Sequence, residues 1–143
     1  MKSLIYFLIF IVVVICGAGV IHGAADKGVT KYQLSTHILD VNLGQPASGV
    51  PIILFKLSDD AESWSKIDEG ITDINGRIGS FLPETTANDG IYKLRFETRD
   101  YFKQQGLDTI YPFVEVIFEI KGDTHYHIPI TMSANGYGTY RGN

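Results

Sequence analysis

Cysteine is almost absent from this 143-residue chain, and the single one, Cys16, lies in the apolar N-terminal segment. If that segment is removed as a leader, no thiol remains, which excludes disulfide bonds and cysteine-based catalysis. Charged residues make up only 20% of the sequence, and the formal net charge is -4. Because no basic run occurs, the electrostatic footprint of a nucleic-acid-binding surface is also missing.

Several signatures of catalytic chemistry are missing as well. The sequence contains no H-E-x-x-H motif, no cysteine pair and no G-x-S-x-G elbow. Its glycine-bearing segments match neither a P-loop nor a dinucleotide-binding pattern, so no nucleotide cofactor is expected. Acidic residues are scattered over predicted turns and solvent faces, which argues against hydrolysis by a carboxylate pair.

The N-terminal segment has the pattern of a secretory signal peptide. Lys2 precedes an unbroken apolar run over residues 4–15, which is short for a membrane span, and small residues follow it. An uncleaved anchor is the alternative. We predict a periplasmic or secreted protein, without stable membrane association after cleavage, that is divided into a signal peptide (1–25), a linker (26–31) and one domain (32–143).

The remainder, roughly 120 residues, is enough for one core. Alternating apolar and polar residues, together with regular turn signals, predict an all-β sandwich. Trp64 and Ile67 are expected in the core, and Asn75-Gly76 is the strongest turn signal. The one helical candidate is Thr98–Gln105, with Thr98 as N-cap and Gly106 as the stop. Strands are expected over residues 32–38, 50–57, 64–71, 78–82, 91–97, 111–120 and 125–132.

The same alternation places two histidines away from the core. His37 falls opposite the apolar positions of the first strand, and His127 falls opposite those of the last. The run that follows, residues 135–143, is rich in glycine and tyrosine. We expect it to dock against the domain rather than fray.

His37, Arg77 and His127 are the candidate site. Taken singly, each could be an ordinary solvated side chain. Together they suit hydrolysis of an activated amide or lactam, because a neutral imidazole can take a proton from water while a guanidinium binds a small, planar, anionic substrate. A rival interpretation is a zinc site formed by His37, His125 and His127.

Five segments, in order along the chain, resemble the transthyretin-related family of 5-hydroxyisourate hydrolases. The terminal Tyr-Arg-Gly is the most specific, since it separates the hydrolases from transthyretin itself. The segments are Ser35–Asp40, Thr72–Ile78, Tyr111–Val116, His125–Pro129 and Tyr140–Gly142.

The resemblance implies a transthyretin-like two-sheet β-sandwich with one short helix, assembled as a homotetramer with active sites between dimers. It implies hydrolysis of the small molecule 5-hydroxyisourate to 2-oxo-4-hydroxy-4-carboxy-5-ureidoimidazoline, a step of urate breakdown, without metal or organic cofactor. His37, Arg77 and His127 would be catalytic. Substrate would be bound by His37, Arg77 and the C-terminal Tyr140, Arg141, Gly142 and Asn143.

Two alternatives and one question stay open. The family usually ends in serine where this chain has Asn143, which keeps a secreted transthyretin-like ligand-binding module without catalysis as an alternative. A purely structural or adhesive sandwich is the other. The sequence does not say whether His37 or His127 is the general base.

Overall fold

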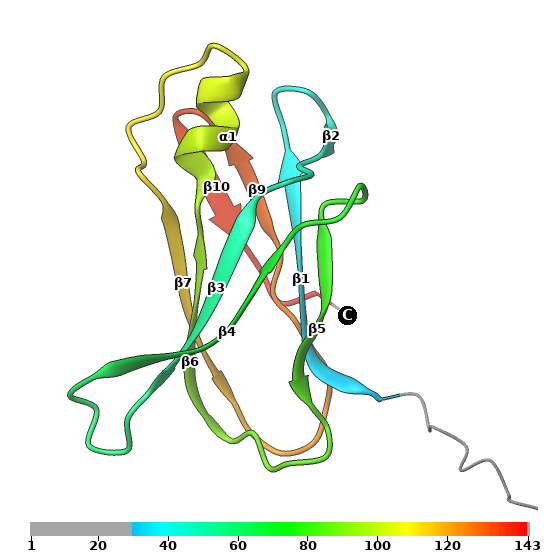
Figure 1. Ribbon diagram of the computed structural model, residues 1–143, viewed down its shortest axis with the longest axis vertical. Coiled ribbons are helices and arrows are strands. Elements are labelled where there is room, and N and C mark those ends of the chain that lie inside the picture. The colour runs from blue at the N-terminus through cyan, green and yellow to red at the C-terminus, as the bar shows by residue number, and fades with distance from the viewer. Residues whose placement is uncertain (1–29, 143) are drawn as a thin grey trace, which may run out of the picture.

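The computed structural model describes residues 30–142, which form two β-sheets packed face to face with one short helix (Figure 1). This confirms the predicted all-β sandwich of two sheets with one short helix. The predicted signal peptide, most of the predicted linker and Asn143 lie outside the described residues. None of the helices in the described part is long and apolar enough to cross a membrane.

The elements follow one another as the turn signals predict, with some boundaries moved. They are β1 (Tyr32–Asp40), β2 (Gln45–Pro46), β3 (Pro51–Leu57), β4 (Trp64–Ile71), β5 (Arg77–Pro83), β6 (Gly90–Phe96), α1 (Thr98–Gln104), β7 (Val114–Ile120), β8 (Tyr126–His127), β9 (Ile130–Ser133) and β10 (Gly136–Thr139).

Strand β1 is the centre of the first sheet. One side of it pairs antiparallel with β5 and then β2, and the other side pairs parallel with β8 and then β9, while β10 continues the sheet beyond β9. Figure 1 shows the red C-terminal segment returning past β1. Segments about 90 residues apart in the chain are therefore neighbours on one sheet, and both candidate histidines come from these segments.

The second sheet has the order β4-β3-β6-β7 and is antiparallel throughout. Its inward side chains, such as Leu54 and Leu94, meet Leu34, Ile38 and Phe81 of the first sheet, and all five are at most 1% exposed. Burying a side chain of this size stabilises the fold by about 1.5–3 kcal/mol. The alternating apolar side chains of both sheets thus form one continuous core between them.

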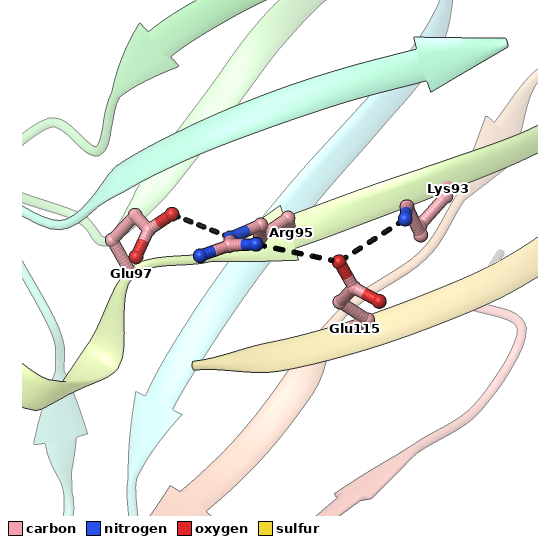
Figure 2. Close-up of polar contacts among 4 residues, drawn as sticks. All are labelled: Lys93, Arg95, Glu97 and Glu115. Carbon is pink, nitrogen blue, oxygen red and sulfur yellow. Dashed lines mark hydrogen bonds and ion pairs between the residues drawn. The ribbon is translucent and has the colours of Figure 1, made fainter. Parts of the chain in front are cut away.

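The outward face of the second sheet carries charges that are paired with one another. Glu115 lies 3.1 Å from the Lys93 ammonium and 3.8 Å from the Arg95 guanidinium, and Glu97 accepts a 2.6 Å hydrogen bond from Arg95 (Figure 2). The Arg95 guanidinium also lies 3.5 Å from the centre of the Phe113 ring. These charges satisfy one another across β6 and β7, and they do not converge on a cleft with a histidine.

Two sequence expectations about the core and the helix need correction, and a third is confirmed. Ile67 is 44% exposed because it is the extra residue of a bulge, where Leu54 pairs with Asp68 and Phe55 with Lys66. Thr98 is the first helical residue and Glu97 takes the N-cap position, since the Thr98 side chain is buried. Gly106, with a φ of 71°, ends the helix as predicted.

Two predicted strands are also shorter than expected. The run 111–120 forms the ladder only from Val114, and the run 125–132 is split into β8 and β9 at Ile128-Pro129. Proline has no N–H to donate to a ladder, which explains the second interruption. The predicted faces are nevertheless correct, since Ile128, Ile130 and Met132 are buried while His125 is exposed.

Candidate active site

The three candidate side chains lie in one open cleft of about 510 Å³ on the outer face of the first sheet. His37 comes from the middle of β1, Arg77 from the start of β5 and His127 from the end of β8. The cleft is completed by Ser35, His125, Tyr140 and Gly142. Its volume is in the range of small-molecule sites.

Strand pairing fixes the position of Arg77 relative to His37. The two residues are register partners in the antiparallel β1–β5 pair, so their side chains leave the sheet on the same face. Arg77 is held there by the turn before it, in which the Asp73 carboxylate accepts 2.8 Å hydrogen bonds from the backbone N–H groups of Asn75 and Arg77. Gly76 makes this turn possible with a φ of 69°. The predicted turn is confirmed, although it joins strands of different sheets rather than a hairpin.

The parallel pairing of β1 with β8 brings the second histidine alongside the first. Ser35 is the register partner of His127, and the His37 and His127 rings stack with their centroids 6.4 Å apart. Both rings are half-buried. The outward placement predicted from alternation is therefore correct for both histidines.

The surroundings favour the neutral form of both imidazoles. Burial lowers the pKa of His37, and the positive charge of Arg77 lowers it further, while Asp73 opposes the shift. Burial also lowers the pKa of His127, with Arg77, His37 and His125 adding to the effect and a hydrogen bond to the Ser35 backbone opposing it. Two imidazoles beside a guanidinium can thus accept protons at neutral pH.

The C-terminal segment docks against the cleft. The Gly142 N–H donates a 2.8 Å hydrogen bond to the His127 carbonyl, and the two residues form an isolated antiparallel bridge. Strand β10 pairs with β9 immediately before this point. The expectation of a docked terminal segment is confirmed for residues 136–142.

The members of the C-terminal motif do not all face the same way. Tyr140 and Gly142 line the cleft, whereas the Arg141 guanidinium lies over the Tyr126 ring, 4.6 Å from its centroid. Arg141 instead borders a separate apolar groove with Val116 and Ile117. The structure therefore brings His37, Arg77, His127, Tyr140 and Gly142 together and leaves Arg141 outside.

Two cleft residues were not assigned to the active site from the sequence. The Ser35 hydroxyl lies 2.8 Å from His125 Nε2 and 2.9 Å from His127 Nδ1, and His125 Nδ1 lies 3.0 Å from the Tyr32 carbonyl. Each lies two residues before a cleft histidine in sequence, so the period-two pattern places both on this face, but it assigns them no role in the site.

A zinc site does not fit this arrangement. Both ring nitrogens of His125 and one of His127 are used in hydrogen bonds to Ser35 and Tyr32. Within residues 30–142, no group of three or more His, Cys, Asp or Glu side chains is arranged to hold a metal ion. Of the nitrogens in the proposed zinc site, only those of His37 and Nε2 of His127 are not used in these bonds, and they suit proton transfer better than metal ligation.

A second hollow, of about 570 Å³, lies at the far end of the first sheet. Its rim includes Glu84, Asp89 and Asp123, without an imidazole or a guanidinium. The Gln33 and Asn88 amides at its base bond to each other at 3.0 Å. The chemistry-bearing side chains are thus concentrated in the histidine–arginine cleft.

The sandwich with this cleft defines a transthyretin-like protein, and comparison with known proteins gives the family. Residues 34–142 match the HIUase/Transthyretin family model, so the chain belongs to the HIUase/Transthyretin family. It is 44% identical over 110 residues to a 5-hydroxyisourate hydrolase of Salmonella dublin, covering 76% of this chain and 79% of that protein. It is 40% identical over 118 residues to a probable 5-hydroxyisourate hydrolase of Caenorhabditis elegans, covering 82% and 86%.

Solved structures agree with this assignment. Klebsiella pneumoniae 5-hydroxyisourate hydrolase superposes with a TM-score of 0.66 at 33% identity, covering 77% of this chain and 98% of the other. Sea bream transthyretin in complex with thyroxine superposes with a TM-score of 0.71 at 30% identity, covering 76% and 93%. Similar proteins thus include both hydrolases and a transthyretin in complex with thyroxine, and the residues of the cleft must distinguish the two kinds.

Proposed function

We propose that this protein is a hydrolase that opens the ring of 5-hydroxyisourate to 2-oxo-4-hydroxy-4-carboxy-5-ureidoimidazoline. The observation that carries the proposal is the convergence of His37, Arg77 and His127 in one cleft. The hydrolase names of its relatives support the same substrate.

The chemistry follows from the side chains of the cleft. A neutral imidazole takes one proton from a water molecule, and the water oxygen bonds to the acyl carbon of the ring amide. The guanidinium of Arg77 stabilises the negative charge that develops on the carbonyl oxygen. When the C–N bond breaks, the abstracted proton goes to the leaving nitrogen, and the new carboxylic acid loses its own proton to solvent. No electron acceptor or cofactor is needed for this balance.

The C-terminal segment has a binding role in this proposal. Tyr140 and Gly142 border the cleft and contact substrate, and Asn143 follows directly after Gly142. Arg141 is stacked on Tyr126 and lies outside the cleft of its own subunit. In this proposal it contacts substrate only where a neighbouring subunit places it beside another cleft.

We also propose a homotetramer. The outermost strands of the two described sheets, β7 and β10, leave apolar side chains at the surface, with Ile117 60% and Tyr137 46% exposed, and Tyr140, just after β10, is 59% exposed. Sheet edges and apolar patches of this kind favour self-association. Sedimentation equilibrium distinguishes a tetramer from a monomer.

Export is the remaining part of the proposal. Residues 1–25 act as a signal peptide, residues 26–31 as a linker, and the domain from residue 32 works in the periplasm or outside the cell. The short apolar run after Lys2 supports this. The mass of the exported protein locates the cleavage point, and a full-length mass would contradict cleavage.

Decay of freshly prepared 5-hydroxyisourate, followed by ultraviolet absorbance, tests the activity. Purified protein should accelerate the decay, and an unchanged spontaneous rate would remove the hydrolase proposal. The alternative, a ligand-binding module without turnover, is favoured by the similarity to thyroxine-bound transthyretin. It requires saturable binding of an aromatic acid without acceleration.

A further inference from the structure

We infer that Ser35 and His125 are positioning residues that hold the proton of neutral His127 on Nδ1, so that the Nε2 lone pair faces the cleft and His127 is the general base. This inference rests on the proposed hydrolase function for its catalytic meaning. The proton arrangement itself can be measured without substrate.

The contact between His125 and the Tyr32 carbonyl determines which atoms donate and which accept in this chain of hydrogen bonds. A backbone carbonyl can only accept, so at the 3.0 Å contact with the Tyr32 oxygen, His125 Nδ1 must carry a hydrogen. Neutral imidazole carries one N–H, and therefore His125 Nε2 has a free lone pair. That lone pair points at the Ser35 hydroxyl, 2.8 Å away.

The Ser35 hydroxyl, which donates to His125, in turn determines which nitrogen of His127 carries the hydrogen. Because the single O–H of Ser35 donates to His125 Nε2, its oxygen is left to accept at the 2.9 Å contact with His127 Nδ1. His127 Nδ1 then carries the hydrogen, and Nε2 is the basic nitrogen. A serine hydroxyl alone could either donate or accept, so His125 is needed to select between the two tautomers.

The backbone keeps the three groups in register. Ser35 and His127 are cross-strand partners in the parallel β1–β8 pair, and the Ile128 N–H donates a 3.0 Å hydrogen bond to the Ser35 carbonyl. The Gly142 N–H holds the His127 carbonyl from the other side. Backbone pairing of the strands thus fixes the positions of Ser35 and His127, whose side chains form the hydrogen bond.

His37 has no comparable hydrogen-bond chain among those the structure describes. It lies beside Arg77, its cross-strand partner, and Asp73 acts on it only at a distance through charge. A histidine with a fixed tautomer is the better proton acceptor, because its lone pair is always at the same atom. His37 therefore serves substrate binding and charge placement, and His127 takes the proton.

Nitrogen-15 NMR of histidine-labelled protein at a pH where the rings are neutral tests the proton arrangement directly. In the unaltered protein we expect His127 to give the Nδ1–H pattern. In Ser35→Ala and in His125→Ala it should move toward the Nε2–H tautomer that predominates for free histidine, whereas Ser35→Thr should restore the original pattern. Ser65→Ala, an exposed strand serine on the other sheet, is the matched control and should change nothing.

Kinetics then test what the fixed tautomer contributes. Ser35→Ala should lower kcat by roughly 10–100-fold, less than the loss on removing the buried carboxylate that orients the histidine of a serine protease. KM should change little, and Ser35→Thr should recover most of kcat.

The outcomes separate this inference from the function on which it rests. An Nε2–H pattern for His127 in the unaltered protein, or an Nδ1–H pattern that survives both Ser35→Ala and His125→Ala, would overturn the inference even if the protein hydrolyses 5-hydroxyisourate. The expected tautomer and its loss in both variants would uphold the proton arrangement even if no hydrolysis is found, and that result would remove only the hydrolase proposal.

Discussion

His37 and Arg77 are direct partners across the antiparallel β1–β5 pair, although 40 positions separate them in the chain. This pairing places a permanent positive charge beside an imidazole on one face of the sheet. The same guanidinium lowers the pKa of both His37 and His127 after the effect of burial. Arg77 is therefore expected to act on substrate and on the protonation of the base at once.

Substitution Arg77→Ala should reveal both effects. We expect kcat/KM to fall about 10²-fold because one donor to the developing oxyanion is lost. The acid limb of the pH–rate profile should also move to higher pH, since the pKa of the neighbouring imidazoles rises when the positive charge is removed. Arg99→Ala, an exposed arginine on α1, is the control and should alter neither quantity. A lower rate with an unmoved acid limb would contradict the electrostatic part of the account.

Gly142 should tolerate no side chain. A Cβ at this position would overlap Cδ2 of the His127 ring, so Gly142→Ala must displace the imidazole or the terminal segment. We expect a loss of at least about tenfold in kcat, because displacements of about 1 Å at a catalytic group cost rate steeply. Gly136→Ala is a matched control on β10, since its Cβ would meet only Ser133 Oγ at 3.7 Å. Full activity of Gly142→Ala would show that the ring position is unimportant.

Stability should depend on pH through the two cleft histidines. Burial lowers the pKa of both His37 and His127 below the ordinary value of 6.5, and Arg77 lowers it further, helped at His127 by His37 and His125. Asp73 opposes the shift at His37, and the Ser35 backbone opposes it at His127. Between the lowered pKa and 6.5 the unfolded chain binds more protons than the folded one, so the free energy of unfolding rises with pH. This contribution is complete above about pH 6.5 and is lost as the pH falls through the folded-state values.

Thermal unfolding across pH 5 to 8 measures this dependence. The double variant His37→Asn/His127→Asn should flatten the rise in Tm over this window relative to the unaltered protein. An equally steep rise in the double variant would assign the pH dependence to other groups.

A buried carboxylate outside the cleft should govern stability rather than activity. Asp40 is fully buried and accepts hydrogen bonds from the Asn42 and Leu43 N–H groups at 2.8 and 3.2 Å and from the Tyr101 hydroxyl at 3.0 Å. Burial and the contact with Asp40 raise the pKa of Tyr101 to about 12, so the phenol stays protonated and donates.

Tyr101→Phe removes that donor from a charged acceptor. The free energy of unfolding should fall by about 1–2 kcal/mol, as measured by urea denaturation, with kcat unchanged. Tyr137→Phe, at an exposed tyrosine, should leave the stability unaltered. Equal stability of the two variants would mean that Asp40 does not depend on the phenol.

Local sequence patterns predicted the faces of the strands but not their registers. The alternation around His37 and around His127 correctly placed both side chains away from the core, because period-two burial is a property of each strand alone. The contact between Ser35 and His127 depends on how two segments 92 positions apart pair, and no local pattern carries that register.

The errors also have physical causes beyond local patterning. Ile67 is apolar and was assigned to the core, but a bulge in an edge strand turns it outward. Thr98 has the composition of a cap, but its side chain faces the core instead of the helix end. In both cases tertiary packing determined the position of a residue whose type suggested another one.

The most direct measurement is the decay of 5-hydroxyisourate with unaltered protein, with His127→Asn and with buffer alone. We expect the unaltered protein to accelerate the decay, and His127→Asn to lose about 10²–10⁴-fold of that acceleration while keeping its fold. If the unaltered protein leaves the spontaneous rate unchanged, or if His127→Asn accelerates the decay as well as the unaltered protein does, the histidine–arginine cleft is not the hydrolytic site described here.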